Sequence, residues 1–225
     1  MIAALIPAKG KSSRVKKKNL LKINGKTLVE RAIIDCKKSK LIDEFFVSSE
    51  DKKIYEISKK NKINFVKRPK NLSKINTPMS SVINHFIFYL KKKKINPKTI
   101  VLIQPTSPFR PSKIIDKLIL KYKRMRIKSL ITIKKTESYF FKTIIKEKKA
   151  LKIKYPKYFF GNTQKLPKTY IANGMVYIFD VNEFLKEKQI PLKKVKFFEI
   201  KIKNDIDIDT MEEFLKAKKI YEKKS

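Results

Sequence analysis

Several residue types that define common protein classes are rare or absent in this sequence. Among its 225 residues there are one cysteine, one histidine, four glycines and no tryptophan. The single Cys36 excludes an intramolecular disulfide bond. The sequence also lacks a signal peptide and any apolar run of about 18 residues, the length that a membrane-spanning helix requires. We therefore expect a soluble cytoplasmic protein that does not associate with a membrane.

Acidic residues are scarce as well. The 20 Asp and Glu residues face 57 Lys and Arg residues, which gives a formal net charge of +37. Such an excess would suggest binding to nucleic acid or to an anionic membrane. However, six of the basic residues are Arg, whereas recognition of phosphates and base edges favours the planar guanidinium. Lysine is accompanied by abundant Ile, Asn, Tyr and Phe, whose codons are rich in A and T. Genome composition and a polyanion-binding surface therefore both remain open as explanations.

The chain contains enough apolar residues to fold. Hydrophobic residues make up 42% of it and aromatic residues 11%, which is more than disordered chains contain. A chain of this length can bury a substantial core. We expect a single domain over residues 1–225 that carries one insertion, at 136–170.

Short runs rich in Ile, Val and Phe alternate with amphipathic segments along the chain. The runs predict strands and the amphipathic segments predict helices. Such alternation predicts an α/β fold with βαβ units around a largely parallel sheet, in which ligands bind beyond the carboxyl ends of the strands. The expected strands span 2–6, 44–48, 64–66, 99–103, 128–133, 174–179 and 195–201, and the expected helices span 27–39, 51–61, 80–93, 112–123, 182–188 and 210–223.

The segment 136–170 interrupts this alternation. Its sequence, TESYFFKTIIKEKKALKIKYPKYFFGNTQKLPKTY, has no strong helical pattern and contains closely spaced aromatic residues, beginning with Tyr139. It predicts an aromatic hairpin and an extended arm. Because this is more aromatic surface than a solvated loop should expose, we expect the arm to be buried against another chain.

A polycationic loop, PAKGKSSRVKKKN, follows the first expected strand directly. Gly10 suits a tight turn, Ser12 can donate to phosphate oxygens, and Lys9, Arg14 and Lys18 supply positive charge. Backbone N–H groups and cations are the groups that bind phosphate. The P-loop spacing Gly-x-x-x-x-Gly-Lys-Ser/Thr is absent. Taken alone, the loop is equally compatible with a phosphate site and with a basic surface.

A second polar loop, LIQPTSPFR, follows the most strand-like run of the chain. Its two prolines stop the strand and hold Thr106 and Ser107 between them, at the expected mouth of the site. Gln104 can both donate and accept hydrogen bonds, which suits a polyhydroxylated ligand. An ordinary strand-ending turn is the alternative interpretation.

Alternating aspartates form the third motif, NDIDIDTMEEF. In an extended segment Asp205, Asp207 and Asp209 would point to one face. Carboxylates that converge in so basic a chain favour a hard divalent cation. As an alternative, Asp209 would cap the last helix, where Thr210 and Glu213 fit a capping box. No capping role is available to Asp207.

Together and in this order, the motifs resemble those of the acylneuraminate cytidylyltransferases, the CMP-sialic acid synthetases. The resemblance covers nearly the whole chain, at the spacing of that family. It implies a Rossmann-like nucleotidyltransferase fold with a mostly parallel central sheet and a small dimerisation insertion. The matching segments are IPAKGKSSRVKKKNLLKINGKTLVERAI, FFVSSEDKKIYEISKK, KRPKNLS, VLIQPTSPFR, NGMVYIF and DIDIDT.

The resemblance also implies roles for individual residues. Lys9 takes the place of an Arg at the start of the phosphate loop, and Lys18 is implied to contact the triphosphate of CTP. Asp207 and Asp209 match the ligands of a Mg²⁺ ion and, with Lys18, form the expected catalytic group. The expected CTP site contains Lys9, Gly10, Ser12, Arg14, Lys18, Asn19, Arg68, Ser80 and Ser81, and the expected sugar site contains Gln104, Thr106, Ser107, Lys142 and Asn173.

Two positions depart from the pattern of the family. Thr163 and Ile171 stand where family members often carry arginines that are implied to grip the sugar from the insertion. A lysine such as Lys142 would replace them as a point charge, without the bidentate guanidinium. The first loop also reads Gly10-Lys11 in place of a pair of glycines.

The implied activity is cytidylyl transfer. The anomeric hydroxyl of a nine-carbon 2-keto acid sugar attacks the α-phosphorus of CTP in line, and pyrophosphate leaves. The enzyme is expected to be a homodimer that uses Mg²⁺ and has no nucleic-acid partner. The single His85 is expected to be structural, and no general base is evident. Two alternatives stay open: CMP-Kdo-type transfer to an eight-carbon or other sugar, and a basic nucleic-acid-binding protein.

Overall fold

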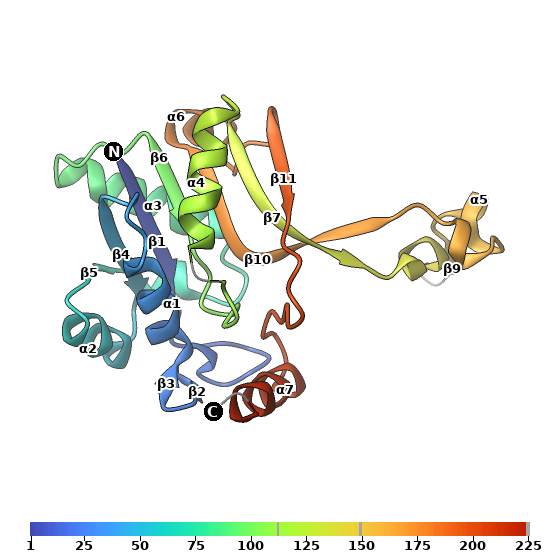
Figure 1. Cartoon of the computed structure of the whole chain (residues 1–225), viewed down its shortest axis with the longest axis horizontal. Coiled ribbons are helices and arrows are strands. Elements are labelled where there is room, and N and C mark those ends of the chain that lie inside the picture. The colour runs from blue at the N-terminus through green and yellow to red at the C-terminus, as the bar shows by residue number, and fades with distance from the viewer. Residues whose placement is uncertain (112, 149, 224–225) are drawn as a thin grey trace.

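The computed structural model describes residues 1–111, 113–148 and 150–223 and has helices on both faces of a central sheet (Figure 1). The sheet has seven strands in the order β11-β7-β10-β6-β1-β4-β5. Strand β10 is antiparallel to β6 and β7, and the other neighbouring strands are parallel. The expectation of a mostly parallel α/β sheet is confirmed. The strands are β1 (Ile2–Pro7), β4 (Glu44–Ser49), β5 (Asn64–Lys67), β6 (Thr99–Leu102), β7 (Ser129–Thr136), β10 (Thr169–Asp180) and β11 (Val195–Glu199).

Two apolar cores hold the helices against the two faces of the sheet. One core contains residues of α1 (Leu28–Lys37), α2 (Lys52–Lys60) and α4 (Ile114–Arg124). The other contains residues of α3 (Met79–Lys92) and α6 (Val181–Glu187). Each expected helix is present to within a few residues at its ends. Ser112, the expected first residue of the fourth helix, lies outside the described residues, as does the side chain of Tyr139.

The last helix belongs to a third, smaller core. Helix α7 (Met211–Glu222) packs against a short hairpin formed by β2 (Lys22–Ile23) and β3 (Lys26–Thr27). Among the described residues, no helix is both long enough and apolar enough to cross a membrane.

The carboxyl ends of β1, β4, β5 and β6 lie at one edge of the sheet because these strands are mutually parallel. The loops that follow them meet there, and two of these loops contain the short 3-10 helices η1 (Lys18–Leu20) and η2 (Lys70–Ser73). The polycationic loop and the LIQPTSPFR loop are therefore neighbours, as parallel strands predict.

Arg110, the last residue of the LIQPTSPFR loop, holds this loop in place. Its side chain is 1% exposed and donates to the Asp35 carboxylate at 2.9 Å and to the Gln104 carbonyl at 2.8 Å. It also donates to the Met175 carbonyl on β10. This arginine lies within a predicted functional motif, but it ties together a helix, a loop and a strand.

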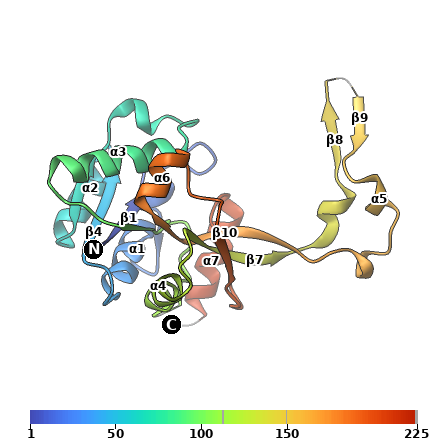
Figure 2. The same cartoon turned by 90° about the horizontal axis from the view of Figure 1, so that it is seen from above.

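Strands β7 and β10 continue beyond the sheet and carry an arm that projects from the body (Figures 1 and 2). In the arm, Phe140, Phe141, Tyr155 and Tyr158 pack their rings together. Apolar side chains remain uncovered, including Phe160, which is 90% exposed. The elements of the arm are η3 (Ser138–Lys142), β8 (Ile144–Glu147), β9 (Ala150–Ile153), α5 (Pro156–Phe159) and η4 (Thr163–Lys165).

Candidate active site

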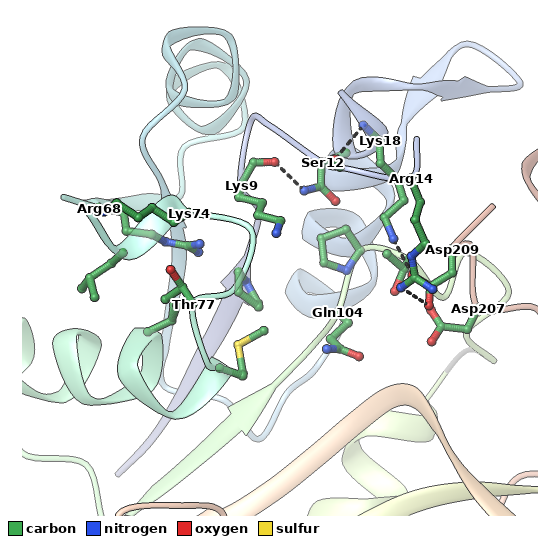
Figure 3. A pocket seen from close by; sticks show the side chains of 17 residues that line it. Lys9, Ser12, Arg14, Lys18, Arg68, Lys74, Thr77, Gln104, Asp207 and Asp209 are labelled. Carbon is green, nitrogen blue, oxygen red and sulfur yellow. Dashed lines mark hydrogen bonds and ion pairs between the residues drawn. The ribbon is translucent and has the colours of Figure 1, made fainter. Parts of the chain in front are cut away.

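The loops at the carboxyl edge of the sheet enclose a cleft of about 330 Å³ (Figure 3). This volume lies in the range of small-molecule sites. One end of the cleft carries Arg68 and Lys74, and the other end carries Lys18, Asp207 and Asp209 (Figure 3). The cleft is lined by Pro7, Lys9, Ser12, Arg14, Lys18, Asn19, Arg68, Leu72, Lys74, Thr77, Met79, Val82, Gln104, Pro105, Thr106, Asp207 and Asp209.

Hydrogen bonds within the polycationic loop fix its path along the cleft. The Ser12 hydroxyl accepts the Lys18 amide at 3.2 Å, and the Asn19 side-chain amide donates to the Lys9 carbonyl at 2.8 Å. Asn19 is buried. Its side chain therefore orders the loop that presents Lys9 and Ser12 to the cleft.

An ion-pair cluster organises the acidic end of the cleft. Lys18 Nζ donates to Asp209 Oδ1 at 2.8 Å and to the Ile208 carbonyl at 2.7 Å. The Arg14 guanidinium contacts Asp209 Oδ2 at 2.8 Å. Burial raises the pKa of Asp209, but Lys18 and Arg14 outweigh burial and hold that pKa below its usual value. Asp209 is consequently ionised at neutral pH.

The cap of helix α7 is made by other residues. The Thr210 hydroxyl accepts the Glu213 amide at 3.2 Å, and the Glu213 carboxylate accepts the amides of Asp209 at 2.7 Å and Thr210 at 2.8 Å. The capping box predicted from the sequence is thus present, with Thr210 as the N-cap. The alternative that the Asp209 side chain caps the helix is wrong.

Asp207 lies in a different electrostatic environment. Its Oδ1 is buried and has no hydrogen-bond partner among the described residues. Burial raises the pKa of Asp207. A hydrogen bond with Thr106 opposes this shift, and the negative charge of Asp209 adds to it. A buried carboxylate with an unpartnered oxygen would be stabilised by a cation.

The two aspartates fit a metal that is shared with a substrate. Among the described residues, no group of three or more His, Cys, Asp or Glu side chains is placed to hold a metal ion. Mg²⁺ usually binds through one or two carboxylates, substrate phosphates and retained waters. The unpartnered Asp207 Oδ1 is suited to that arrangement.

Asp205 does not line the cleft. Its Oδ2 accepts the Asn173 side-chain amide at 2.8 Å, and its carbonyl accepts Lys134 Nζ at 3.1 Å. The segment 201–209 is irregular and forms no strand. The alternation expected of an extended segment is therefore lost, and Asp207 and Asp209 converge without Asp205.

A bulge in β10 brings backbone close to the cleft. The pairing of β10 with β7 shifts register between Ala172 and Tyr177, and Gly174 within the bulge has φ +69°. A Cβ at Gly174 would lie 2.6 Å from Gln104 Oε1 and 2.9 Å from Asp207 Oδ2. Gln104 and Asp207 therefore pack against a position that requires glycine.

Arg68 is fixed at the opposite end of the cleft. Its Nε donates to the Ser48 hydroxyl at 3.2 Å and its Nη2 donates to the Ser48 carbonyl at 2.8 Å. Burial lowers the pKa of Arg68 to about 10, so the guanidinium remains charged at neutral pH. Leu72, Met79 and Val82 contribute apolar side chains to the lining of the cleft.

The structure brings most of the predicted site residues to the cleft. These are Lys9, Ser12, Arg14, Lys18, Asn19, Arg68, Gln104, Thr106, Asp207 and Asp209.

The remaining predicted residues lie elsewhere. Ser80 and Ser81 line a separate hollow between α3 and α6, and Gly10 lines a hollow between the polycationic loop and residues 73–76. Ser107 is 1% exposed and donates to the carbonyl of Asn173, which is fully buried. Lys142 lies on the arm.

Sequence reasoning missed one wall of the cleft, contributed by the loop after β5 and the first turn of α3. Leu72, Lys74, Thr77, Met79 and Val82 lie there. A usable signal was present, because any loop that follows a parallel strand opens onto the same edge of the sheet.

Three comparisons show which known proteins this chain resembles. Residues 3–224 match the family model described as Cytidylyltransferase. The pseudaminic acid cytidylyltransferase of Campylobacter jejuni is 26% identical over 220 residues, which cover 96% of this chain and 94% of the relative. An N-acylneuraminate cytidylyltransferase of Streptococcus agalactiae is 24% identical over 94% of this chain and 51% of its own length. The solved structure of a CMP:2-keto-3-deoxy-manno-octonic acid synthetase with CTP has a TM-score of 0.75 and 13% identity, and the match covers 100% of this chain and 99% of that one.

Proposed function

Because the chain belongs to the cytidylyltransferase family and is a nucleotidyltransferase, we propose that it transfers CMP from CTP to a nine-carbon 2-keto acid sugar. The observation that carries this proposal is the polarity of the cleft. A guanidinium occupies one end, and cations with two carboxylates occupy the other, while apolar side chains also line the cleft. A nucleotide has the same polarity, with a planar base at one end and phosphates at the other.

The base and ribose occupy the Arg68 end. Leu72, Met79 and Val82 offer apolar contact to the faces of the ring, and the fixed guanidinium of Arg68 donates to its acceptors. The triphosphate runs past Lys9 and Ser12 toward Lys18. Arg14 and Lys18 exchange part of their contact with Asp209 for contact with phosphate oxygens, which are the acceptors that cations prefer.

Asp207 and Asp209 are the residues that would hold Mg²⁺. When bound, this ion neutralises charge on the triphosphate and on the leaving pyrophosphate. Lys18 supplies a further positive charge where negative charge develops during transfer. The acid sugar lies beside Gln104 and Thr106, which line the cleft next to Asp207. His85 does not line the cleft, so no histidine there acts as a general base.

Two relatives that match most of this chain are named for pseudaminic and N-acylneuraminic acid, which supports a nine-carbon acid sugar. We expect pyrophosphate release when CTP is supplied with at least one member of a panel containing pseudaminic, N-acetylneuraminic and legionaminic acids. Release with the eight-carbon sugar Kdo alone would contradict the nine-carbon class. RNA binding with a steep salt dependence, without pyrophosphate release from any nucleotide, would favour the nucleic-acid alternative.

The arm completes the active site of a partner in a homodimer. Exposed apolar side chains, among them Leu151 at 73% and Phe160 at 90%, support burial of the arm on a second copy. Both cartoon views show the arm pointing away from the body, so Lys142 does not reach the cleft of its own chain (Figures 1 and 2). Thr163 and Ile171, where family members often carry arginine, lie on the same arm or at its base. Lys142 supplies positive charge to the sugar carboxylate across the interface.

Mixed dimers test this contribution. We expect Lys142→Ala subunits and Asp207→Asn subunits to be weakly active alone. When the two are mixed, the Lys142→Ala subunit has an intact Asp207 and its partner supplies an intact Lys142 to the same site. The mixed dimer should therefore regain one intact site of two. Action of Lys142 within its own chain would restore nothing. A fully active monomer, measured by light scattering at micromolar concentration, would contradict the dimer.

A further inference from the structure

The turn after β4 lies between the polycationic loop and Arg68. The Ser48 carbonyl accepts the Ala8 amide at 2.9 Å and Arg68 Nη2 at 2.8 Å. The next carbonyl, of Ser49, accepts the Arg68 amide at 2.8 Å. One short segment therefore contacts both the loop that runs along the triphosphate and the residue at the base end of the cleft. This segment is the SSED sequence, residues 48–51, within the segment FFVSSEDKKIYEISKK. Its residues have no role in the mechanism described above.

Glu50 extends this link through its side chain. Its Oε1 accepts the Gly10 amide at 2.9 Å, so this amide is directed at a carboxylate and not at a bound phosphate. The other oxygen, Oε2, is buried without a hydrogen-bond partner among the described residues. The negative charge of Glu50 stabilises the charged form of Arg68. A single carboxylate thus acts on both ends of the cleft without lining it.

The contact of the loop with this turn leaves no free space. A Cβ at Gly10 would lie 2.4 Å from Asp51 Oδ2 and 2.6 Å from Asp51 Cβ. Asp51 is itself fixed as the N-cap of α2, where it accepts the amides of Lys53 and Ile54. The position of Gly10 is therefore set by the turn, and the carboxylate of Glu50 completes that contact.

We infer that Glu50 is a positioning residue that fixes the polycationic loop to the end of β4, where the Ser48 and Ser49 carbonyls bind Arg68, so that the phosphate and base ends of the nucleotide site form together. The inference rests on the proposed function, because it assumes that the cleft binds CTP. Glu50 does not touch the nucleotide. It acts through Gly10 on one side, and on the other through the neighbouring backbone of Ser48 and Ser49, which binds Arg68.

Glu50 also acts on Arg68 through its charge. Burial lowers the pKa of Arg68 to about 10, and the negative charge of Glu50 opposes this shift. Glu50 therefore favours the charged form of the guanidinium.

The test uses CMP and inorganic pyrophosphate as separate probes of the two ends, titrated calorimetrically into the full-length protein. Glu50→Ala is expected to weaken both probes about tenfold or more, the effect of losing one charge-assisted hydrogen bond. Glu50→Gln keeps an acceptor for Gly10. At pH 7.5 it should therefore bind both probes with an affinity closer to that of the wild type than Glu50→Ala does. Exposed Glu56 on α2 provides the matched control, since Glu56→Gln should change neither probe.

The outcomes distinguish a failure of the inference about Glu50 from a failure of the proposed function. If the wild type binds neither CTP nor CMP, the proposed function fails. If the wild type binds them and folded Glu50→Ala retains normal affinity for either probe, the inference is wrong. Should Glu50→Ala fail to fold, Glu50→Asp decides the question, because its shorter side chain withdraws the carboxylate from Gly10, and normal affinity for both probes would overturn the inference.

Discussion

Replacing Asp207 with asparagine is expected to lower turnover by about 10²-fold or more while leaving the protein at least as stable as the wild type. The loss of turnover follows from removing one of two carboxylates at the metal site, where charge on the triphosphate must be neutralised. Asparagine is nearly isosteric and keeps an oxygen for Thr106, so packing is preserved. Pyrophosphate release measured over a range of Mg²⁺ concentrations checks the first part.

The stability of this variant follows from the environment of Asp207. Burial raises its pKa, which means that folding disfavours the ionised form. Ionised Asp207 therefore lowers the free energy of unfolding above its folded-state pKa, and this penalty disappears as the pH falls through that pKa. The Asp207→Asn variant lacks the penalty and should melt at the same temperature or higher at pH 7.5 without metal.

Asp205 provides a matched control for Asp207. It belongs to the same motif and burial also raises its pKa, but its carboxylate accepts from Asn173 and does not line the cleft. Asp205→Asn should lower turnover far less than Asp207→Asn. Equal losses from the two variants would indicate that the motif is structural and that Asp207 has no special role.

Replacing Gly174 with alanine should lower turnover by a similar factor, about 10². The new Cβ would overlap Gln104 Oε1 and Asp207 Oδ2. Both side chains must then move out of the cleft, and with them the contact to the sugar and one ligand of the metal. Steady-state kinetics at saturating CTP and sugar measure the effect.

Gly25 separates this overlap from backbone strain. It has φ +73°, close to that of Gly174, but nothing lies within 4 Å of a Cβ placed there. Gly25→Ala should therefore lose roughly 1–2 kcal/mol of stability from its left-handed backbone and keep its turnover. If Gly174→Ala behaved like Gly25→Ala, the close packing of Gln104 and Asp207 on the bulge would be unimportant for catalysis.

Much of the fold was predictable because it depends on local pattern. Alternating strands and amphipathic helices, ended by Pro or capped by residues such as Thr27 and Thr210, specify a parallel sheet and the edge where its loops meet. That edge accounts for the polycationic loop and the LIQPTSPFR loop being neighbours, whereas the grouping of Asp207 with Lys18 followed only from the resemblance to a family. The antiparallel direction of β10 was not predictable, since it depends on where the chain returns after the arm.

Some residues predicted for the site do not line the cleft because of the direction of their side chains. Ser80 and Ser81 belong to the segment that borders the cleft, but Met79 and Val82 line it, because residues three apart share a face of a helix. Asp205 was grouped with Asp207 on the assumption of a strand, and the irregular path of 201–209 turns it toward Asn173. Such directions depend on tertiary contacts that a sequence pattern does not contain.

The central claim is that this cleft binds CTP and uses it for transfer. Its most direct test is pyrophosphate release by the wild-type protein with CTP, UTP, ATP and GTP, each supplied with one accepted acid sugar, with and without Mg²⁺. The account predicts release with CTP that requires both the sugar and Mg²⁺, and little release with the other nucleotides. Equal release from all four nucleotides, or no release from CTP with any acid sugar, would contradict it.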